Sequence, residues 1–465
     1  MLTLYAGHRS RDCAGISRRD FLRAGFLGLG GLTLPWLLRT RAEAASLNSD
    51  FVRDKAVVLV FLAGGASHIE TFNPNMDAPE PQRSLTGEVK TTLTSVTLGG
   101  TFPGLARHAK KMAIVRSFQH RVGSHEQAIV HVLTGGSDAT GQGKDGFSMG
   151  SAYARCRGSN HERTGLPTYC LLTAPHKDGQ YARELQRVVK GSHAGSLGAA
   201  VEPFSPGGNG PGLTNMQLHL PVERLEDRRL LLRKLDDLKR GLDLGEGLDP
   251  FERQALALLT GGASKAFDLT QEDRKVVTHY DTGMFPCGKK VFEPSILGKQ
   301  MLLARRLIEA GAGFVTVQSA GWDMHADGNN PGIKDGMEML GRPLDKALSA
   351  FLEDIEQRGM LDKVLLVVTG DFGRTPKINK KGGRDHWANL CTLALFGGGL
   401  NVGQVIGKSG RNNDVPATEP ITPANLLSTL MHTLFDVGKL RVARGLPANL
   451  IRRIESTKPI EALFS

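Results

Sequence analysis

The chain has 465 residues, of which 40% are hydrophobic and 23% are charged, a composition typical of a globular protein with a large core. The formal charge of +11 includes +4 in the first 44 residues and shows no dominant basic block, so we predict no nucleic-acid partner. Five scattered cysteines are too few for a disulfide framework or a zinc knuckle. Outside the N-terminal segment we expect buried thiols, with one disulfide as the alternative.

The first 45 residues have the pattern of an export signal. Arg18 and Arg19 precede an apolar, glycine-rich run that contains Pro35 and ends before the A-x-A sequence of residues 42–44. The run is shorter than the about 20 residues of a membrane span. We therefore predict cleavage near Ala44, with an uncleaved anchor as the alternative. The segment resembles a twin-arginine signal, which implies passage through the twin-arginine export machinery to the periplasm or the cell exterior. No later segment approaches transmembrane length.

The mature chain, residues 46–465, is interpreted as one domain built on a buried sheet. Apolar, β-branched runs predict strands at 55–62, 112–115, 168–172, 314–318, 364–369 and 390–396. Helices are predicted at 103–111, 124–133, 146–157, 302–308, 337–355 and 422–434. Residues 176–294 are rich in Gly, Pro and charge, with helices predicted at 225–238 and 251–259. We interpret that stretch as a variable insertion or lid beside the sheet.

Residue types that bind metals follow three of the predicted strands. They are His68 and Glu70 after 55–62, Asp323 and His325 after 314–318, and Asp371, Asp385 and His386 after 364–369. In parallel α/β sheets, ligands bind just outside the carboxyl ends of the strands. The three loops therefore predict a site at one edge of the sheet. The alternative is that these side chains are ordinary loop residues that satisfy turns and helix ends.

The last two of these loops belong to one β-α-β unit, because a helix with an apolar stripe at 337–355 joins strands 314–318 and 364–369. Pro343 either kinks this helix or marks its beginning. The two strands should be parallel, with a right-handed crossover, so that both loops leave the same edge. If the strands are neighbours, about 4.8 Å apart, Asp323 and Asp371 can converge on one ion. The segment after Arg374 is long enough to return His386 to that edge.

Carboxylate and imidazole ligands together suit Zn, Mn or a similar divalent ion better than calcium. Two such ions about 3.5–4 Å apart could clamp the oxygens of a phosphoryl or sulfuryl transfer. Arg374 could hold an oxyanion through paired hydrogen bonds, or form a surface salt bridge. Ser124 is either the N-cap of a helix or a nucleophile in the positive field of that helix end. His125 is the stronger candidate for involvement in the site.

The chain resembles the exported DUF1501 family through GGASHIETF, SHEQAIVHVLTG, AGWDMHAD and VVTGDFGRTPKINKKGGRDHW. This family is similar, more remotely, to the alkaline phosphatase and sulfatase superfamily. The resemblance implies a three-layer α/β fold with a mostly parallel sheet between helices and metal ligands at the strand ends. It also implies that Asp371 and His386 correspond to the superfamily's late metal-binding aspartate and histidine.

The sequence departs from these families at the expected site. The Cys/Ser-x-Pro-x-Arg signature of sulfatases is absent, and His125 falls near its nucleophile position with Ser124 beside it. Phe372 stands where the superfamily has a second ligand, while Glu70 and Asn73 stand where the family has aspartates. Asp371 replaces the usual glutamate. One metal ion, or none, is therefore an alternative to a two-metal site.

These observations predict an exported, metal-dependent hydrolase of phosphate or sulfate esters, acting on a small or polymeric anionic ester. The catalytic candidates are Ser124, His125 and Arg374. The metal-ligand candidates are His68, Glu70, Asp323, His325, Asp371, Asp385 and His386. The alternative is a catalytically degenerate member that binds a polyanion or another exported protein. Export argues against a phosphomutase-like isomerase, whose phosphorylated sugars are mainly cytoplasmic.

Overall fold

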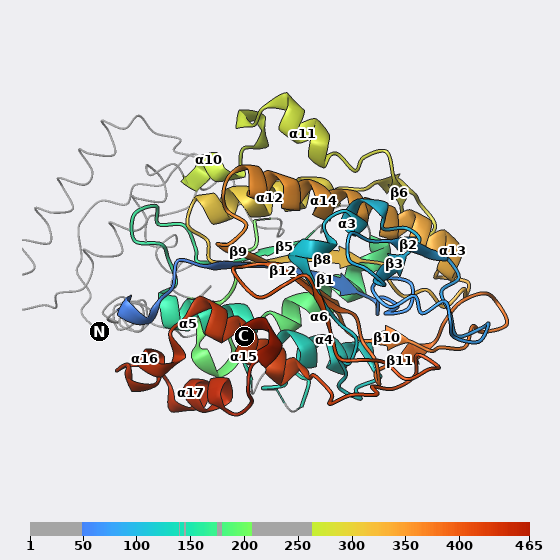
Figure 1. The fold of residues 1–465 in the computed structure, drawn as a ribbon. Helices are drawn as coiled ribbons and strands as arrows, with labels where there is room; N and C mark the ends of the chain where they lie inside the picture. Colours follow the sequence, from blue (N-terminus) through green and yellow to red (C-terminus); the bar gives the residue numbers. More distant parts are fainter. Residues whose placement is uncertain (1–48, 139, 144–145, 174–178, 207–262) are drawn as a thin grey trace, which may run out of the picture.

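A computed structural model describes residues 49–138, 140–143, 146–173, 179–206 and 263–465 (Figure 1). Its centre is a seven-stranded sheet with the order β13-β4-β12-β9-β1-β8-β5. In that order the strands are β13 (Gln404–Ile406), β4 (Met112–Val115), β12 (Leu393–Gly397), β9 (Val364–Gly370), β1 (Ala56–Ala63), β8 (Phe314–Ala320) and β5 (Tyr169–Leu172). Within this sheet only β12 runs antiparallel to its neighbours. The predicted mostly parallel α/β sheet is therefore confirmed.

The burial of strand β1 explains why its sequence is a continuous run of apolar residues. All eight of its residues are buried. Val58, Val60 and Leu62 join the core on one face of the sheet, and Val57 and Leu59 join the core on the other. A strand covered on both faces has no polar side, so the usual alternation of apolar and polar residues disappears.

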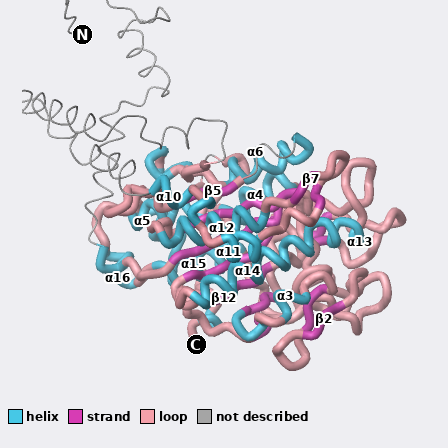
Figure 2. The backbone as a smooth tube through the Cα atoms, turned by 90° about the horizontal axis from the view of Figure 1, so that it is seen from above, coloured by secondary structure: helices cyan, strands magenta, loops and turns pink. Residues whose placement is uncertain are grey.

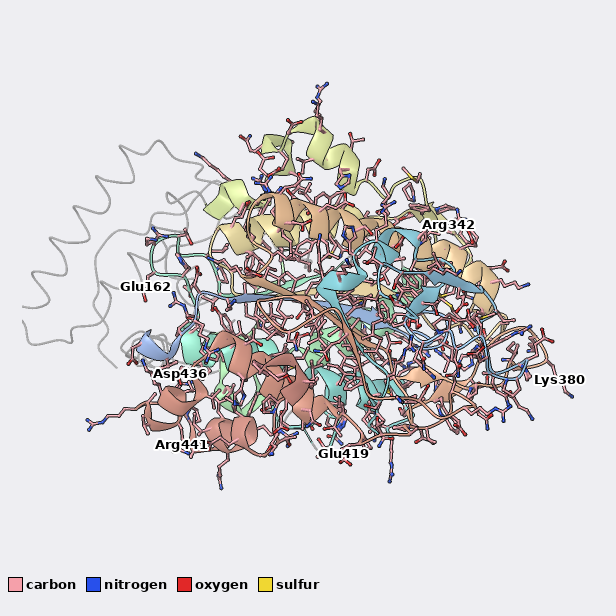
Figure 3. The ribbon with its side chains drawn as sticks, viewed as in Figure 1. Glu162, Arg342, Lys380, Glu419, Asp436 and Arg441 are labelled. Atoms are coloured by element: carbon pink, nitrogen blue, oxygen red, sulfur yellow. The ribbon has the colours of Figure 1, made fainter. Side chains whose placement is uncertain are left out.

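Helices cover both faces of the sheet, which gives the three layers (Figure 1). One face is covered by α3 (Pro103–Ala106), α10 (Ala263–Phe267), α11 (Arg274–Tyr280), α12 (Leu297–Glu309) and α14 (Arg342–Gln357). The other is covered by α4 (His125–Leu133), α5 (Met149–Arg157), α6 (Ala182–Gly191), α15 (Pro423–Leu434), α16 (Val437–Val442) and α17 (Ala448–Glu455). Figure 2 shows α11, α12 and α14 from above. Charged side chains such as Arg342, Lys380 and Arg441 extend from the surface (Figure 3).

Strands β8 and β9 are parallel, as the β-α-β unit predicts, but they are not neighbours because β1 lies between them. Their carboxyl ends still lie level with that of β1, since Ala63 pairs with Ala320 and Leu62 pairs with Gly370. The three loops that follow β1, β8 and β9 therefore leave one edge together. The convergence that the sequence predicted occurs across three strands instead of two.

The helix between β8 and β9 is interrupted close to its proline. It consists of α13 (Ile333–Gly336), a π-helical turn at Met337–Gly341, and α14, in whose first turn Pro343 lies. Proline lacks the N–H that a regular helix would use there, and π turns are a known form of such an interruption. Pro343 thus marks the beginning of the long regular helix, which was one of the two predicted outcomes.

Smaller hairpins decorate the sheet: β2 (Glu88–Lys90) with β3 (Thr97–Gly99), β6 (Pro286–Cys287) with β7 (Glu293–Pro294), and β10 (Gly373–Arg374) with β11 (His386–Trp387). The helices predicted at 225–238 and 251–259 and the predicted export signal lie outside the described residues. Cys156, Cys170 and Cys391 are buried free thiols. None of the described helices has the length and apolar character needed to cross a membrane.

Candidate metal centre

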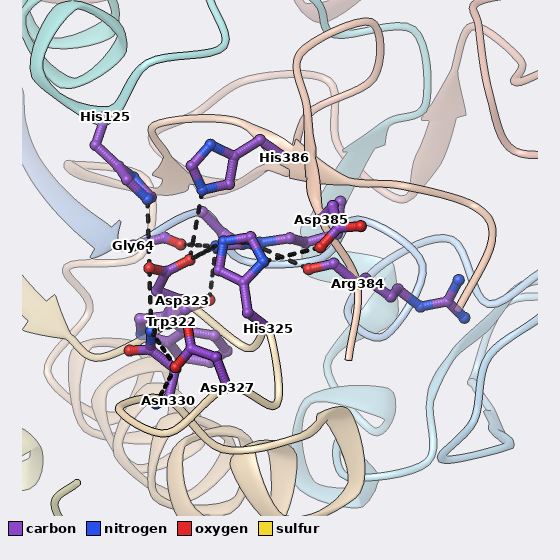
Figure 4. A network of polar contacts seen from close by, with 12 residues as sticks. Gly64, His125, Trp322, Asp323, His325, Asp327, Asn330, Arg384, Asp385 and His386 are labelled. Atoms are coloured by element: carbon purple, nitrogen blue, oxygen red, sulfur yellow. Dashed lines mark hydrogen bonds and ion pairs between the residues drawn. The ribbon is translucent and has the colours of Figure 1, made fainter. Parts of the chain in front are cut away.

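Three side chains from distant segments meet above the carboxyl ends of β1, β8 and β9. One nitrogen each of His125 and His386 and one carboxylate oxygen of Asp323 lie within 4.8 Å of one another (Figure 4). His125 opens α4, Asp323 lies in the loop after β8, and His386 belongs to β11. Two imidazoles and a carboxylate are a ligand set suited to a divalent ion such as Zn or Mn.

Close backbone approaches hold this arrangement together. Gly64, directly after β1, has φ of 113°, and a Cβ atom there would lie 2.7 Å from the backbone nitrogen of Asp323. Only glycine lets the loop after β8 pass so near the end of β1. On the other side, the β10–β11 hairpin pairs Arg374 with His386, which is how the chain returns His386 to the edge of the sheet.

The orientation of His125 is set by Asp371, the first residue after β9. Nδ1 of His125 lies 2.5 Å from Oδ2 of Asp371, whose Oδ1 accepts a hydrogen bond from the Gly64 N–H at 3.0 Å. Asp371 is completely buried. A carboxylate that binds one nitrogen of a histidine and leaves the other for the metal is a common feature of metal sites. Asp371 therefore lies on the side of the His125 ring away from Asp323 and His386, where its contacts position the ring.

Nε2 of His125 and Nε2 of His386 are buried and have no hydrogen-bond partner among the described residues. They lie 3.5 and 3.6 Å, respectively, from oxygens of Asp323. Nδ1 of His386 lies 3.0 Å from the carbonyl oxygen of Gly123, to which it can donate, and its Nε2 faces Asp323. Buried polar atoms normally find partners. A cation between these nitrogens and Asp323 would satisfy them, so the side chains present fit a bound ion.

Charges around Asp323 keep it ionised. Its Oδ1 lies 2.5 Å from Nη2 of Arg374 and 3.0 Å from Nε2 of His325. Burial acts to raise the pKa of Asp323, but contacts with His125, His325, His386 and Arg374 outweigh burial and hold that pKa well below its usual range. Asp323 is therefore available as an anionic ligand throughout the physiological pH range.

The pKa of His125 is shifted in the opposite direction, upward. Burial acts to lower the pKa of its imidazole, but the carboxylates of Asp323 and Asp371 on its two sides outweigh burial and raise that pKa to about 9. In the absence of an ion, His125 is thus a cation held between two anions. A divalent ion would take over this charge when it displaces the proton from Nε2.

Arg374 is completely buried, and its donors are directed at the protein. Nε donates to the Gly65 carbonyl at 2.7 Å, and Nη1 donates to the Arg384 carbonyl at 3.1 Å. Nη2 donates to the Gly64 carbonyl and to Asp323. The predicted role of Arg374 in holding a substrate oxyanion does not fit this placement, because its N–H groups are engaged. Arg374 instead positions Asp323 and places a fixed positive charge on one side of it.

His325 and Asp385 lie next to the three-residue group but outside it. Nε2 of His325 contacts Asp323, and Nδ1 lies 3.0 Å from Oδ1 of Asp385, so both ring nitrogens have partners. The side chain of Asp385 is 60% exposed. The two residues form a chain of contacts, Asp385–His325–Asp323, that orients the carboxylate of Asp323 (Figure 4).

His68 and Glu70 are not brought to this group. Glu70 and Arg384 form an ion pair at 3.0 Å in which both side chains are completely buried. Oε2 of Glu70 also accepts from the Ser84 hydroxyl at 2.7 Å. Nε2 of His68 lies 3.0 Å from the Asn413 carbonyl, and burial lowers the pKa of His68 to about 4. The predicted ligand roles of His68 and Glu70 do not fit these contacts, which tie loops together.

Ser124 and Phe372 border the candidate ligands. Ser124 is exposed at the N-cap of α4, and its side chain makes no capping hydrogen bond. Phe372 is completely buried, with its ring centre 4.7 Å from that of His125 and 4.5 Å from that of His386. The ring occupies the position where the family resemblance implied a second ligand, and it packs against the two histidines.

A cleft of about 460 Å³ opens beside His125 and Asp323. Its other lining residues are Gln180, Arg183, Glu184, Arg187, Lys289, Lys290, Asn329 and Asn330. The sequence pattern did not point to these four basic residues: Arg183 and Arg187 lie at 182–191, where no helix was predicted, and Lys289 and Lys290 lie in a turn far from it along the chain. Arg183 and Arg187 are four residues apart there, a spacing that places side chains on one helix face and that a helical assignment would have revealed.

The family comparison agrees with the motifs in the sequence. The model of the family described as "Protein of unknown function (DUF1501)" matches residues 54–462 of the 465-residue chain. The chain belongs to the DUF1501 family. No curated protein matches its sequence. The resemblance inferred from the motifs around His125, Asp323 and His386 is thus confirmed.

Solved structures similar to this DUF1501 chain include a sulfatase, a lipoteichoic acid synthase and an alkaline phosphatase. A sulfatase from Pseudoalteromonas sp. is 10% identical, with 86% of this chain and 72% of that chain covered and a TM-score of 0.36. The lipoteichoic acid synthase LtaP from Listeria monocytogenes is 11% identical, with 85% and 77% covered and a TM-score of 0.37. Alkaline phosphatase from the Antarctic bacterium TAB5 is 13% identical, with 78% and 95% covered and a TM-score of 0.33.

Proposed function

We propose that this DUF1501 protein is an exported, metal-dependent hydrolase of phosphate or sulfate esters. The observation that carries the proposal is the pair of buried Nε2 atoms of His125 and His386, which make no hydrogen bond among the described residues and lie 3.5 and 3.6 Å from the carboxylate of Asp323. Such atoms cost free energy unless a partner satisfies them, and a cation is the partner that all three groups can share. The group lies beside an open cleft, where a substrate has access to it.

His125, His386 and Asp323 would hold one divalent ion, with Zn or Mn best suited to two nitrogens and one oxygen. Three protein ligands leave a coordination position open, as in catalytic zinc sites. When bound, such an ion supplies Lewis-acid polarisation of an ester oxygen and lowers the pKa of a nearby hydroxyl or water. One ion is proposed instead of two, because the guanidinium of Arg374 already places a positive charge on Asp323.

Ser124 is the proposed nucleophile. Its hydroxyl is exposed, makes no capping bond, and precedes His125 at the positive end of α4, where the helix field favours an anionic oxygen. Attack by its oxygen would form a bond to phosphorus or sulfur and release the alcohol, which takes up the hydroxyl proton. Water would then hydrolyse the serine ester and restore Ser124. Asp371 and Arg374 contribute by positioning His125 and Asp323.

A second function, binding of an anionic ligand without turnover, is favoured by one observation. Arg374 and Phe372 fill places around Asp323 and the two histidines where a two-metal enzyme would need a further ion or ligand. A protein with that function would still bind anions in the cleft but would not hydrolyse the ester.

Metal analysis of the purified mature chain, combined with assays on aryl phosphate and aryl sulfate, tests the proposal. We expect about one Zn or Mn per chain and turnover of one ester class. The variant Asp323→Ala with His386→Ala should lose both metal and turnover. A matched control, Asp335→Ala with His279→Ala, removes one exposed carboxylate and one exposed imidazole elsewhere and should keep both. Full metal content in the first variant contradicts the site, and a metal-free, inactive wild type favours the binding function.

Export is part of the proposal and rests on the twin-arginine pattern of the leader. Replacing Arg18 and Arg19 by lysine should keep the full-length precursor in the cytoplasm. Fractionation of cells that produce both forms measures this, and normal export of the lysine variant would contradict the signal assignment.

A further inference from the structure

We propose that the substrate is a carbohydrate ester with more than one anionic group, and that Arg183 and Lys290 bind a second anionic group while the first lies at His125 and Asp323. This inference rests on the proposed function and names the substrate class for the same site. It depends on the shape of the cleft, on the charges that face it, and on the kinds of side chain that line it.

The cleft is larger than a single ester group requires. A volume of about 460 Å³ lies within the range of pockets that enclose whole small molecules, roughly 300–1,000 Å³. A phosphate or sulfate group bound at His125 and Asp323 would fill only one part of it. The rest extends toward α6, which carries Arg183, and the turn that carries Lys290. A ligand that fills the cleft must therefore continue from the candidate metal centre to these two cations.

Two of the four basic residues of the cleft have acidic partners, and two do not. Nζ of Lys289 lies 3.2 Å from Glu184, and Arg187 lies 3.1 Å from Glu126. Arg183 and Lys290 form no ion pair with any described residue. An exposed cation is ordinarily just solvated. Here, however, two cations without acidic partners lie in one concave cleft, next to the site proposed for an anionic ester. Together they create a positive electrostatic potential in the cleft that would attract a second anionic group.

The basic wall is built from two segments that are tied together. Gln180 precedes α6, and its Oε1 accepts hydrogen bonds from the backbone N–H groups of Lys289 at 2.9 Å and Lys290 at 2.5 Å. Lys289 also packs over the ring of Tyr181, with Nζ 4.9 Å from the ring centre. The turn at 288–291 is thereby held against the start of α6. The backbone that carries Lys290 is therefore held next to α6, which carries Arg183, and this reduces the entropy lost when one ligand binds both cations.

The remaining side chains favour a carbohydrate over a nucleic acid. Gln180, Asn329 and Asn330 bring amide groups, which both donate to and accept from hydroxyls. No Phe, Tyr or Trp is among the described residues that line the cleft, whereas single-stranded nucleic acids are held largely by bases stacked on such side chains. A hydroxyl-rich chain with sulfate or phosphate groups fits amides and cations together.

A direct binding measurement on the mature protein tests the inference. The probe is a size-defined, sulfated heparin hexasaccharide, and the method is isothermal titration calorimetry. The variant is Arg183→Ala with Lys290→Ala. The matched control is Arg274→Ala with Lys275→Ala, which removes one exposed Arg and one exposed Lys from α11 and so changes the net charge equally. We expect hexasaccharide binding to weaken by about tenfold or more in the variant and by less than about twofold in the control.

Further probes separate the possible outcomes. Inorganic sulfate should bind the variant as it binds the wild type, and an uncharged hexasaccharide and single-stranded DNA of equal charge should bind the wild type more weakly than the sulfated probe. Equal losses in variant and control would show a general charge effect and overturn the inference. DNA binding as tight as that of the hexasaccharide would overturn the carbohydrate assignment in favour of a nucleic acid.

The binding test does not depend on turnover. If the wild type fails to hydrolyse aryl esters but Arg183 and Lys290 still govern hexasaccharide binding, the proposed hydrolase function fails and the polyanion site stands. If aryl esters are hydrolysed and hexasaccharide binding is unchanged in the variant, the inference fails and the hydrolase stands. Both residues are exposed, so thermal unfolding of the variant should match the wild type and exclude misfolding as a cause.

Discussion

Oδ2 of Asp371 lies 2.5 Å from Nδ1 of His125. This contact decides which nitrogen of the imidazole turns toward Asp323 and His386, and it places Asp371 behind a candidate ligand. The sequence suggested Asp371 itself as a ligand, because the residue follows a buried strand directly. Its complete burial and its bonds to His125 and Gly64 instead support a positioning role.

The positioning role predicts a graded loss of metal affinity. Asp371→Asn keeps the shape of the side chain but removes the charge that orients His125, and changes of this kind typically lower metal affinity about 10- to 100-fold. Titration against a competing chelator measures the affinity. The control is Asp345→Asn, a buried carboxylate that accepts from the N–H groups of Gly104 and Leu105, and it should leave the affinity unchanged. Complete loss of metal at saturating concentration would point to Asp371 as a direct ligand.

Metal affinity should rise with pH. The pKa of His125 is raised to about 9 in the metal-free protein, whereas a metal binds the neutral imidazole, so binding must displace a proton at neutral pH. The apparent affinity should therefore increase about tenfold per pH unit from pH 7 and level off above about pH 9. Proton release during calorimetric titration in two buffers checks this. An affinity that is flat between pH 7 and 9 would show that Nε2 of His125 does not bind the ion.

Glu70 should matter for stability and not for metal content. Glu70→Gln leaves the buried guanidinium of Arg384 without its counter-charge, and breaking such a pair typically costs about 3–5 kcal/mol. Urea unfolding measures the free energy of unfolding, and metal analysis of the folded variant is the second readout. A stable variant that lacks metal would restore Glu70 as a ligand.

His68 should make the protein sensitive to acid. Burial lowers its pKa to about 4 in the folded state, against 6.5 in the unfolded chain. Between these values the unfolded chain binds more protons, so stability falls as the pH is lowered from 6.5 to 4. The loss is up to about 3 kcal/mol. In His68→Gln the thermal unfolding temperature should vary less with pH in this window than in the wild type or in the exposed control His279→Gln. Identical profiles would show that His68 is not the group responsible.

Ser124→Ala separates catalysis from capping. Because the hydroxyl makes no capping hydrogen bond, its removal should change the free energy of unfolding by less than about 0.5 kcal/mol and leave bound metal intact. Turnover of the preferred aryl ester should fall by about a thousandfold or more if Ser124 is the nucleophile. Turnover close to that of the wild type would assign the attack to water instead.

Local patterns predicted the elements of the fold because they depend on neighbours along the chain. The apolar runs at 55–62 and 364–369 correspond to β1 and β9 within one residue. The loops after β1, β8 and β9 were expected at one edge because parallel strands end together. What the patterns could not show was that β1 separates β8 from β9, since strand order depends on contacts between segments some 250–310 residues apart.

The sequence alone therefore determined that carboxylates and histidines follow the buried strands. It also determined that these side chains lie at one edge of the sheet. Only the tertiary structure decided their roles. It turned Glu70 toward Arg384, set Asp371 behind His125, and joined His125, Asp323 and His386 into one group. The role of a side chain depends on which groups from distant parts of the chain lie in contact with it. The local sequence pattern carries no information about those partners.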